Sequence, residues 1–357
     1  MELLSVTIND GVMPRSEIEG KDNSSEDKSN YKVVLTGDMV YNSMRMWQGA
    51  NGISPCDGIV SPAYTVLMPK IPISNGYFAA LFKSPNLINK FRKNSLGMTS
   101  DTWNLKYPQI ETIKVCIPTL SEQNRVADML NTLEQRIAKQ ARLVDSLKKY
   151  KRGVVRTLLN PNSCCAVNAT WTTAKIGDLG TFTKGAPLSK ADIAPDGTPF
   201  ILYGELYTTY HEVINAVFRS TKVQPEKQYY SHVGDVIIPT SGETPEEIST
   251  AACVMLPDII LAGDLNIFRS SKIDGRIMSY ILNHIANGQI ALIAQGKSVV
   301  HIQASEISKI EISYPDYNTQ NKMIRIFDAL STKIEIEQNE LMALRCIQKA
   351  LLQLLFI

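Results

Sequence analysis

The feature that most constrains the fold of this 357-residue chain is an internal repeat. Residues 110–159 align with residues 307–356, an offset of 197, so that IETIKVCIPTLSEQNRVADML falls on ISKIEISYPDYNTQNKMIRIF. Each copy has the pattern of a strand, a proline, a short loop and then a long helix. Repeats of this kind indicate a duplicated structural unit.

The helical part of each copy has a coiled-coil pattern. Its apolar positions recur at alternating steps of four and three residues, the seven-residue period that favours a coiled coil over two unrelated amphipathic helices. Polar residues interrupt both seams at matching places, Gln140 with Glu337 and Lys151 with Gln348. Because such residues cost stability but fix register, we expect these four to set the helix register. The predicted seam residues are Leu130, Leu133, Ile137, Gln140, Leu147 and Lys151 in the first helix and Phe327, Leu330, Ile334, Glu337, Leu344 and Gln348 in the second.

A globular stretch precedes each helix, and the two stretches also correspond. Gly37-Asp38 matches Gly234-Asp235, and each pair is followed by a polar loop, an apolar segment and one helix candidate, FAALFKSPNLINKF or IMSYILNHIANGQI. The predicted order is therefore globular, helix, globular, helix. The expected limits are 1–118 for the first domain, 119–160 for its helix, 161–315 for the second domain and 316–357 for its helix.

The two globular stretches differ at their beginnings. The second contains about 27 residues, within Trp171–Pro199, that have no counterpart before Gly37. We therefore expect an N-terminally shortened first domain, either by natural truncation or in the form expressed.

The composition limits the possible classes of protein but does not identify one. The formal net charge of +2, from 37 basic and 35 acidic residues, neither requires nor excludes a nucleic-acid partner. No run of 18 apolar residues and no signal-peptide pattern is present, so we expect a cytoplasmic chain without a membrane partner. The six cysteines form no CxxC pair, which predicts reduced thiols and no metal site.

Enzyme motifs are sparse. Gly296-Lys297-Ser298 resembles the end of a phosphate-binding loop, but Ala291 stands where that motif needs glycine. The four histidines are scattered without a recognisable triad pattern. We therefore assign no catalytic residue to the chain.

Polar loops and basic residues of the globular stretches have the chemistry of DNA readers. Arginine pairs with guanine, asparagine and glutamine pair with adenine, and a carboxylate accepts from cytosine. Lysines bind phosphates, which fixes position but not sequence. The candidate DNA-binding residues are Asn42, Ser43, Arg45, Trp47, Gln48, Lys83, Lys90, Arg92 and Lys93 in the first stretch and Lys184, Thr240, Ser241, Glu243, Thr244, Lys297 and Ser298 in the second.

Together these motifs resemble the specificity (S) subunit of type I restriction–modification systems. The most specific are Ile117-Pro118-Thr119-Leu120-Ser121-Glu122-Gln123 before the first helix, the segment from Met44 to Tyr64, and the Trp171…Ile176-Gly177-Asp178…Lys184-Gly185 opening of the second unit. The resemblance extends over the whole chain.

The resemblance implies an α+β fold with two mixed α/β target-recognition domains, separated by two long antiparallel coiled-coil helices. Each domain would read one half of a split double-stranded DNA site. The subunit itself would be non-catalytic and would dock two adenine-N6 methyltransferase subunits that carry S-adenosylmethionine. Motor-nuclease (restriction) subunits that use ATP and magnesium are a further implied partner, and no cofactor is expected in this chain.

Two other hypotheses stay open at the level of sequence. A non-productive relative would bind methyltransferase subunits through its helices without supporting modification. A stand-alone methyltransferase or nuclease would require cofactor binding by the purified chain alone.

Overall fold

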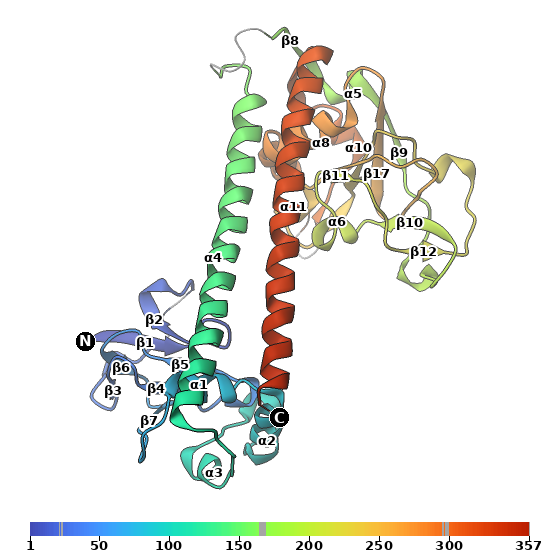
Figure 1. Ribbon diagram of the computed structural model, residues 1–357. Coiled ribbons are helices and arrows are strands. Elements are labelled where there is room, and N and C mark those ends of the chain that lie inside the picture. Colours follow the sequence, from blue (N-terminus) through green and yellow to red (C-terminus); the bar gives the residue numbers. More distant parts are fainter. Residues whose placement is uncertain (21, 23, 164–168, 295, 297–299, 357) are drawn as a thin grey trace. The chain divides into compact units, whose positions relative to one another are not determined.

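A computed structural model describes residues 1–356 except 21, 23, 164–168, 295 and 297–299 (Figure 1). The chain divides into two compact units, unit 1 with Met1–Val144 and Ile336–Ile357 and unit 2 with Asp145–Glu335. Whereas the expected domain limits treat each long helix as a separate spacer, this division cuts through both helices. Each half of a helix packs on the core of its own unit.

Unit 1 contains two small sheets. One has the order β2-β1-β6-β3, in which β1 and β6 are parallel, and the other is an antiparallel sheet of order β5-β4-β7. The strands are β1 (Glu2–Val6), β2 (Val12–Pro14), β3 (Lys32–Val34), β4 (Met39–Asn42), β5 (Asn51–Ile53), β6 (Gly58–Val60) and β7 (Tyr64–Leu67).

Short helices cover the β4 sheet of unit 1. The single helix expected for FAALFKSPNLINKF is two helices, α1 (Asn75–Leu81) and α2 (Pro85–Asn94), followed by α3 (Tyr107–Glu111). The break has a local cause, because the Ser84 side chain caps α2 and Pro85 takes its first turn. Met39, Tyr41, Phe82 and Phe91 form the core with residues from both long helices.

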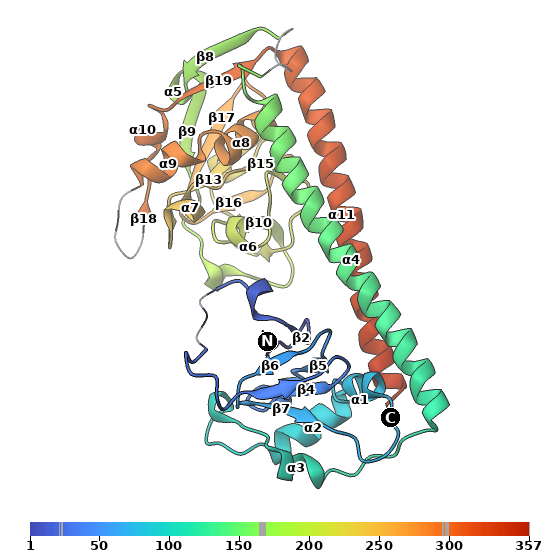
Figure 2. The same ribbon diagram turned by 90° about the vertical axis from the view of Figure 1, so that its left-hand side faces the viewer.

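Unit 2 is built around a five-stranded sheet of order β11-β15-β13-β17-β9, with smaller sheets beside it (Figure 2). Its central strands β13 and β17 are buried at almost every position, as the apolar run in the sequence indicates. The strands are β8 (Trp171–Lys175), β9 (Gly180–Lys184), β10 (Thr198–Leu202), β11 (Val213–Ile214), β12 (Ser220–Thr221), β13 (Asp235–Pro239), β14 (Ser241–Gly242), β15 (Ala252–Val254), β16 (Ile260–Ala262), β17 (Leu265–Ser270), β18 (Val300–His301) and β19 (Glu311–Pro315).

The helices of unit 2 pack on one buried core with this sheet. The second helix candidate, IMSYILNHIANGQI, is again divided in two, as α8 and α9. The short helices are α5 (Ile176–Leu179), α6 (Glu205–Thr208), α7 (Pro245–Ile248), α8 (Gly275–His284), α9 (Asn287–Ile293) and α10 (Ala304–Ile307).

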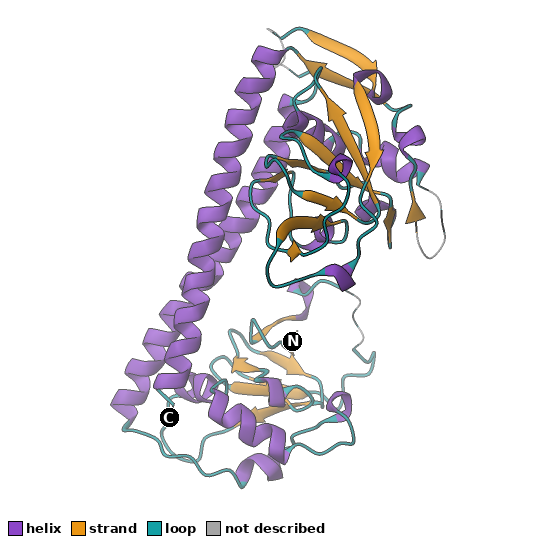
Figure 3. Ribbon diagram, turned by 90° about the vertical axis from the view of Figure 1, so that its right-hand side faces the viewer, coloured by secondary structure: helices purple, strands orange, loops and turns teal. Residues whose placement is uncertain are grey.

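Two long helices, α4 (Leu120–Leu158) and α11 (Tyr317–Leu354), lie side by side in both views (Figures 1 and 3). They run antiparallel, because Arg136 of α4 pairs with Glu340 of α11 while the later Gln140 pairs with the earlier Glu337. Every predicted seam residue is buried or half-buried. The α+β class with two mixed units and two long antiparallel helices is confirmed.

The predicted strand at the start of each repeat forms only once. β19 pairs along its whole length with β8, whereas the equivalent residues 114–118 form no strand. The prediction for the first copy was wrong because a strand needs a neighbour: no described segment of unit 1 takes the position of β8.

The two units otherwise share one connectivity. Parallel pairing of β1 with β6 matches that of β10 with β16, and β5-β4-β7 matches β15-β13-β17. The elements β8, α5 and β9 have no counterpart among the described residues of unit 1.

None of the helices in the described part of the chain combines the length and apolarity that crossing a lipid bilayer requires.

Candidate nucleic-acid interface

The first candidate surface lies in unit 2, where β13 ends at Pro239 and Thr240 follows it. The Thr240 N–H donates to the carbonyl of Asp264, and the Thr240 carbonyl accepts from Ile302 N–H. The next residue, Ser241, is buried and donates from its hydroxyl to the Asp264 carboxylate at 2.8 Å. Asp264 itself is exposed at the turn between β16 and β17. These hydrogen bonds therefore hold the loop after β13 beside an exposed carboxylate.

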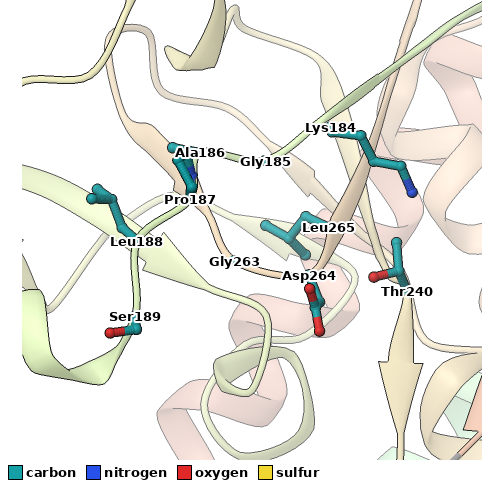
Figure 4. A pocket seen from close by; sticks show the side chains of 10 residues that line it. All are labelled: Lys184, Gly185, Ala186, Pro187, Leu188, Ser189, Thr240, Gly263, Asp264 and Leu265. Atoms are coloured by element: carbon teal, nitrogen blue, oxygen red, sulfur yellow. The ribbon is translucent and has the colours of Figure 1, made fainter.

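A pocket of about 440 Å³ opens at this turn and is lined by residues of three segments (Figure 4). Figure 4 shows the Lys184 amino group, the Thr240 hydroxyl and the Asp264 carboxylate on neighbouring segments of its wall. The Lys184 Nζ is 2.9 Å from the Asn266 amide oxygen, which holds the amino group in place. The pocket wall thus offers a cation, a hydroxyl and a carboxylate, which together can donate to and accept from base edges or phosphates.

Backbone packing at the pocket requires a glycine after Lys184. A Cβ atom on Gly185 would lie 2.7 Å from the carbonyl oxygen of Gly263. Gly263 has a φ of +80°, which also favours glycine. The Lys184-Gly185 dipeptide of the sequence therefore has a steric reason, since it lets the two segments approach each other.

Tyr207 also stabilises the loop after β13 by a hydrogen bond. Its hydroxyl donates to the Ser241 carbonyl at 2.6 Å. Burial raises the pKa of Tyr207, and the carboxylates of Glu247 and Asp264 raise it further. The phenol therefore remains a neutral donor at physiological pH.

One of the predicted reader residues of unit 2, Thr244, uses its side chain to cap a helix. Thr244 caps α7 by accepting from Glu247 N–H at 3.2 Å, and the Glu247 carboxylate accepts from the Glu243 and Thr244 N–H groups. The Glu243 side chain itself is exposed. Two further candidates, Lys297 and Ser298, lie outside the described residues.

The second candidate surface lies in unit 1, on the loop that follows β4. Asn42 closes an Asx turn by accepting from Met44 N–H, and the buried Ser43 hydroxyl donates to the Ala63 carbonyl. The half-buried side chains of Arg45 and Gln48 make no hydrogen bond or ion pair with any described residue. The polar groups of these two side chains are therefore available to contact a ligand.

An aromatic and basic cluster flanks this loop. Trp47 packs edge-on against Trp103 with ring centroids 5.1 Å apart, and the Arg92 guanidinium lies 5.7 Å from the Trp47 ring. Arg92 and Lys93 are exposed on α2, and Lys90 is half-buried on the same helix. Lys83, by contrast, is 3.4 Å from the Glu134 carboxylate, so that its charge is partly compensated within the unit.

The two loops occupy equivalent places in their units. Each follows the central strand of its sheet, β4 or β13. The 3-10 turn Met46–Gln48 packs on α2, just as α7 packs on α9. The chain therefore presents one polar loop per unit on the same scaffold, although the two loops have different side chains.

Sequence reasoning missed two residues that complete these surfaces, Asp264 and Trp103. The available signal for the first was the turn dipeptide Gly263-Asp264 directly after an apolar run. Trp103 carried no local signal, because only the tertiary fold brings it to Trp47. In the described ranges, no group of three or more His, Cys, Asp or Glu side chains is placed to hold a metal ion.

The polar seam residues divide into one pair that meets and one that does not. Gln140 Nε2 donates to both the backbone carbonyl and the carboxylate of Glu337, at 3.1 and 2.5 Å. Because the helices are antiparallel and the repeat offset is 197 (337 minus 140), repeat-equivalent residues meet only near this pair. Lys151 instead pairs with Glu212 of unit 2, and Gln348 is hydrogen-bonded to Glu134 of unit 1.

Comparisons with known proteins agree with this arrangement. Residues 168–345, which include the Lys184 pocket, match the family model of the type I restriction modification DNA specificity domain. The structure resembles the crystal structure of a type I restriction–modification S subunit from M. genitalium, with a TM-score of 0.61, 14% identity and coverage of 98% of this chain and 89% of the other. A second solved structure, from work on complex assembly and conformational transition of the type I R-M system, gives a TM-score of 0.57, 16% identity and coverage of 92% and 83%.

A curated relative extends the match to most of the chain. It is described as the MjaX specificity subunit of a type I restriction enzyme from Methanocaldococcus jannaschii, and it is 20% identical over 366 residues, or 94% of this chain and 81% of the relative. The chain therefore carries a DNA specificity domain in unit 2. It belongs to the family of type I restriction–modification specificity subunits, whose role is DNA recognition.

Proposed function

We propose that this chain reads a bipartite double-stranded DNA site, one half with each unit. The observation that carries the proposal is the pair of equivalent loops, one following β4 and one following β13, each packed on an equivalent helix. In this proposal the antiparallel helix pair α4–α11 acts as the spacer that sets the gap between the two half-sites. Lys184 and the basic residues of α2 bind phosphates, while Arg45, Gln48, Thr240 and Glu243 face the bases.

The helices are also the proposed docking surface for two adenine-N6 methyltransferase subunits. Exposed apolar side chains on the helix halves of unit 1 support this, since α11 carries Ile336, Met342 and Ile347 at 55%, 61% and 51% exposure. S-adenosylmethionine then belongs to the methyltransferase partners, and ATP and magnesium belong to any restriction subunits that join. This chain supplies recognition and performs no bond-making step itself.

The decisive experiment exchanges recognition segments. The chain is co-expressed with the methyltransferase subunit of its own system, and N6-methyladenine is mapped across the host genome. We expect a split motif with a fixed gap. Replacing residues 171–306 by the corresponding segment of a specificity subunit with another target should change one half-site and leave the other half-site and the gap as they were. A methylated motif that stays the same after the exchange would refute the proposal.

A matched pair of lysine variants tests the pocket. Lys184→Ala should weaken DNA binding and reduce the slope of log affinity against log salt by about one, because one phosphate contact is lost. The control, Lys175→Ala, removes an exposed lysine of β8 in the same unit. Equal effects of the two variants would exclude Lys184 from the interface.

Docking is tested separately by co-purification. Ile347→Glu places a charge on the exposed apolar face of α11, whereas Asn339→Glu places one at an exposed polar position of the same helix. We expect only the first to lose the methyltransferase. Retention of the partner by both variants would argue against docking on this face.

A further inference from the structure

Unit 1 has an open sheet edge at the place where unit 2 has a paired strand. In unit 2, β17 lies between β13 and β9, and its ladder with β9 extends from Asn266 to Ser270. In unit 1, β7 pairs with β4 on one side, and no described strand pairs with its other side. Unpaired edges of this kind are templates for strand addition.

Exposure along the two equivalent strands differs accordingly. Residues 265–268 of β17 are at most 2% exposed. All four residues of β7 are partly exposed, and Met68 and Ile71, which follow the strand, are 84% and 62% exposed. The outer edge of β7 therefore lacks the cover that β17 receives.

A second segment of unit 1 lacks the same neighbour. Residues 114–118 are exposed, and the backbone groups of Lys114–Ile117 make no hydrogen bond with any described residue. Their equivalents in β19 pair with β8 residue by residue. Val115 is 39% exposed, whereas its repeat equivalent Ile312 is 4% exposed.

In unit 2 one continuous segment fills both places. β8 pairs with β19, α5 turns the chain by donating from Ile176 N–H to the Ile310 carbonyl at 2.9 Å, and β9 pairs with β17. The segment contributes Ile176 and Leu179 to the buried core, and its Phe182 ring packs at a tilt against Phe268, with the ring centroids 5.1 Å apart. Its residues are Trp171–Lys184.

We propose that unit 1 binds an extended strand–turn–strand segment of another polypeptide, which pairs with residues 114–118 and with the outer edge of β7. The partner segment has the chemistry of Trp171–Lys184, with apolar side chains at the positions of Ile176, Leu179 and Phe182. A second copy of this chain is a poor donor, because releasing its own segment would break as many pairings as it forms. Main-chain hydrogen bonds give such strand addition its affinity, and the side-chain pockets give it specificity.

The probe is a fluorescently labelled synthetic peptide of residues 171–186, titrated into the full chain and followed by anisotropy. We expect saturable binding, together with slower amide exchange at residues 64–68 and 113–117. A peptide with the same residues in scrambled order should not bind. Absence of saturable binding, or protection confined to β17 and β19 of unit 2, would overturn the proposal.

A backbone variant tests the mode of binding. Alternate residues of an antiparallel strand donate to the partner, so Val115→Pro with Cys116→Pro removes a donor whichever way the segment faces. The free chain loses no hydrogen bond among its described residues and should keep its helical content and melting temperature. Peptide affinity should fall about tenfold or more, since a lost hydrogen bond of this kind costs roughly one such factor.

The control variant, Val115→Thr with Cys116→Val, keeps both N–H groups and should bind the peptide with the affinity of the unaltered chain. Equal affinity of the proline and control variants would refute strand pairing at residues 114–118. These readouts involve no DNA and no methylation, so they are independent of the proposed reading of a bipartite site.

Discussion

Replacing Lys151 by methionine should destabilise unit 2 by about 3 kcal/mol. Lys151 Nζ is 2.9 Å from one carboxylate oxygen of Glu212, and His284 Nε2 is 2.7 Å from the other. The three side chains are only 13–15% exposed. The Lys151 ammonium also lies 5.2 Å from the Tyr280 ring. Methionine replaces the apolar stem of the lysine side chain but leaves a buried carboxylate without its cation.

The magnitude follows from the geometry of this cluster. Removing one partner of a buried ion pair costs roughly 3–5 kcal/mol, because the other charge is left uncompensated. Here His284 still contacts Glu212 and the site keeps some solvent access, so the lower end of that range applies. About 3 kcal/mol corresponds to roughly a hundredfold change in the folding equilibrium, at about 1.4 kcal/mol for each factor of ten.

The assay is native-state hydrogen exchange of the β13 amides in the full chain, because two units need not unfold in one transition. The double variant Lys151→Met with Glu212→Gln removes the uncompensated charge and should recover most of the lost stability. If the single variant costs less than about 0.5 kcal/mol, the ion pair is not a significant determinant of stability. If the double variant is no more stable than the single one, the cause is lost packing and not an unpaired charge.

Three further predictions concern acid stability, register and the pocket. Burial alone raises the pKa of Glu212, but the hydrogen bond from His284 and the charge of Lys151 outweigh it and lower the pKa overall. The stability that this carboxylate contributes is therefore fully present above its unfolded-state pKa of about 4.3, and it is lost as the pH falls through the folded-state pKa. Urea titrations between pH 6 and 3 should show a steeper decline in stability for the unaltered chain than for Glu212→Gln. Gln140→Leu should lower the free energy of unfolding, measured by heat or urea, by about 1–2 kcal/mol, because the carboxylate of Glu337, a residue that is 7% exposed, loses its hydrogen bond from Gln140. The double variant with Glu337→Leu should recover this stability. If the single variant is as stable as the unaltered chain, the pair does not stabilise the seam. Gly185→Ala should lower the free energy of unfolding by about 1–3 kcal/mol and weaken DNA binding, since its Cβ would lie 2.7 Å from a backbone oxygen of the β16–β17 turn. The control is Gly153→Ala on α4, where an added Cβ meets nothing within 4 Å, and it should leave DNA binding unchanged.

The long helices were determined by the sequence alone. The seven-residue period from Leu130 to Leu158 and its copy predicted both helices and their buried seams, because a helix side is specified by local spacing. The duplication likewise predicted two units with one connectivity. Local chemistry at Ser84-Pro85 contained the signal for the α1–α2 break, but a continuous apolar pattern concealed it.

Only the tertiary structure decided which equivalent residues form equivalent contacts. The segments 114–118 and Glu311–Pro315 have similar sequences, yet only the second is a strand, since a strand depends on a neighbour supplied from elsewhere in the chain. Lys151 and Gln348 occupy the same seam position, yet the antiparallel geometry separates them, and each takes a partner that its sequence neighbourhood does not reveal. The pocket of unit 2 also depends on the tertiary structure. Lys184, Thr240 and Asp264 are far apart along the chain, and the pairing of strands brings them together.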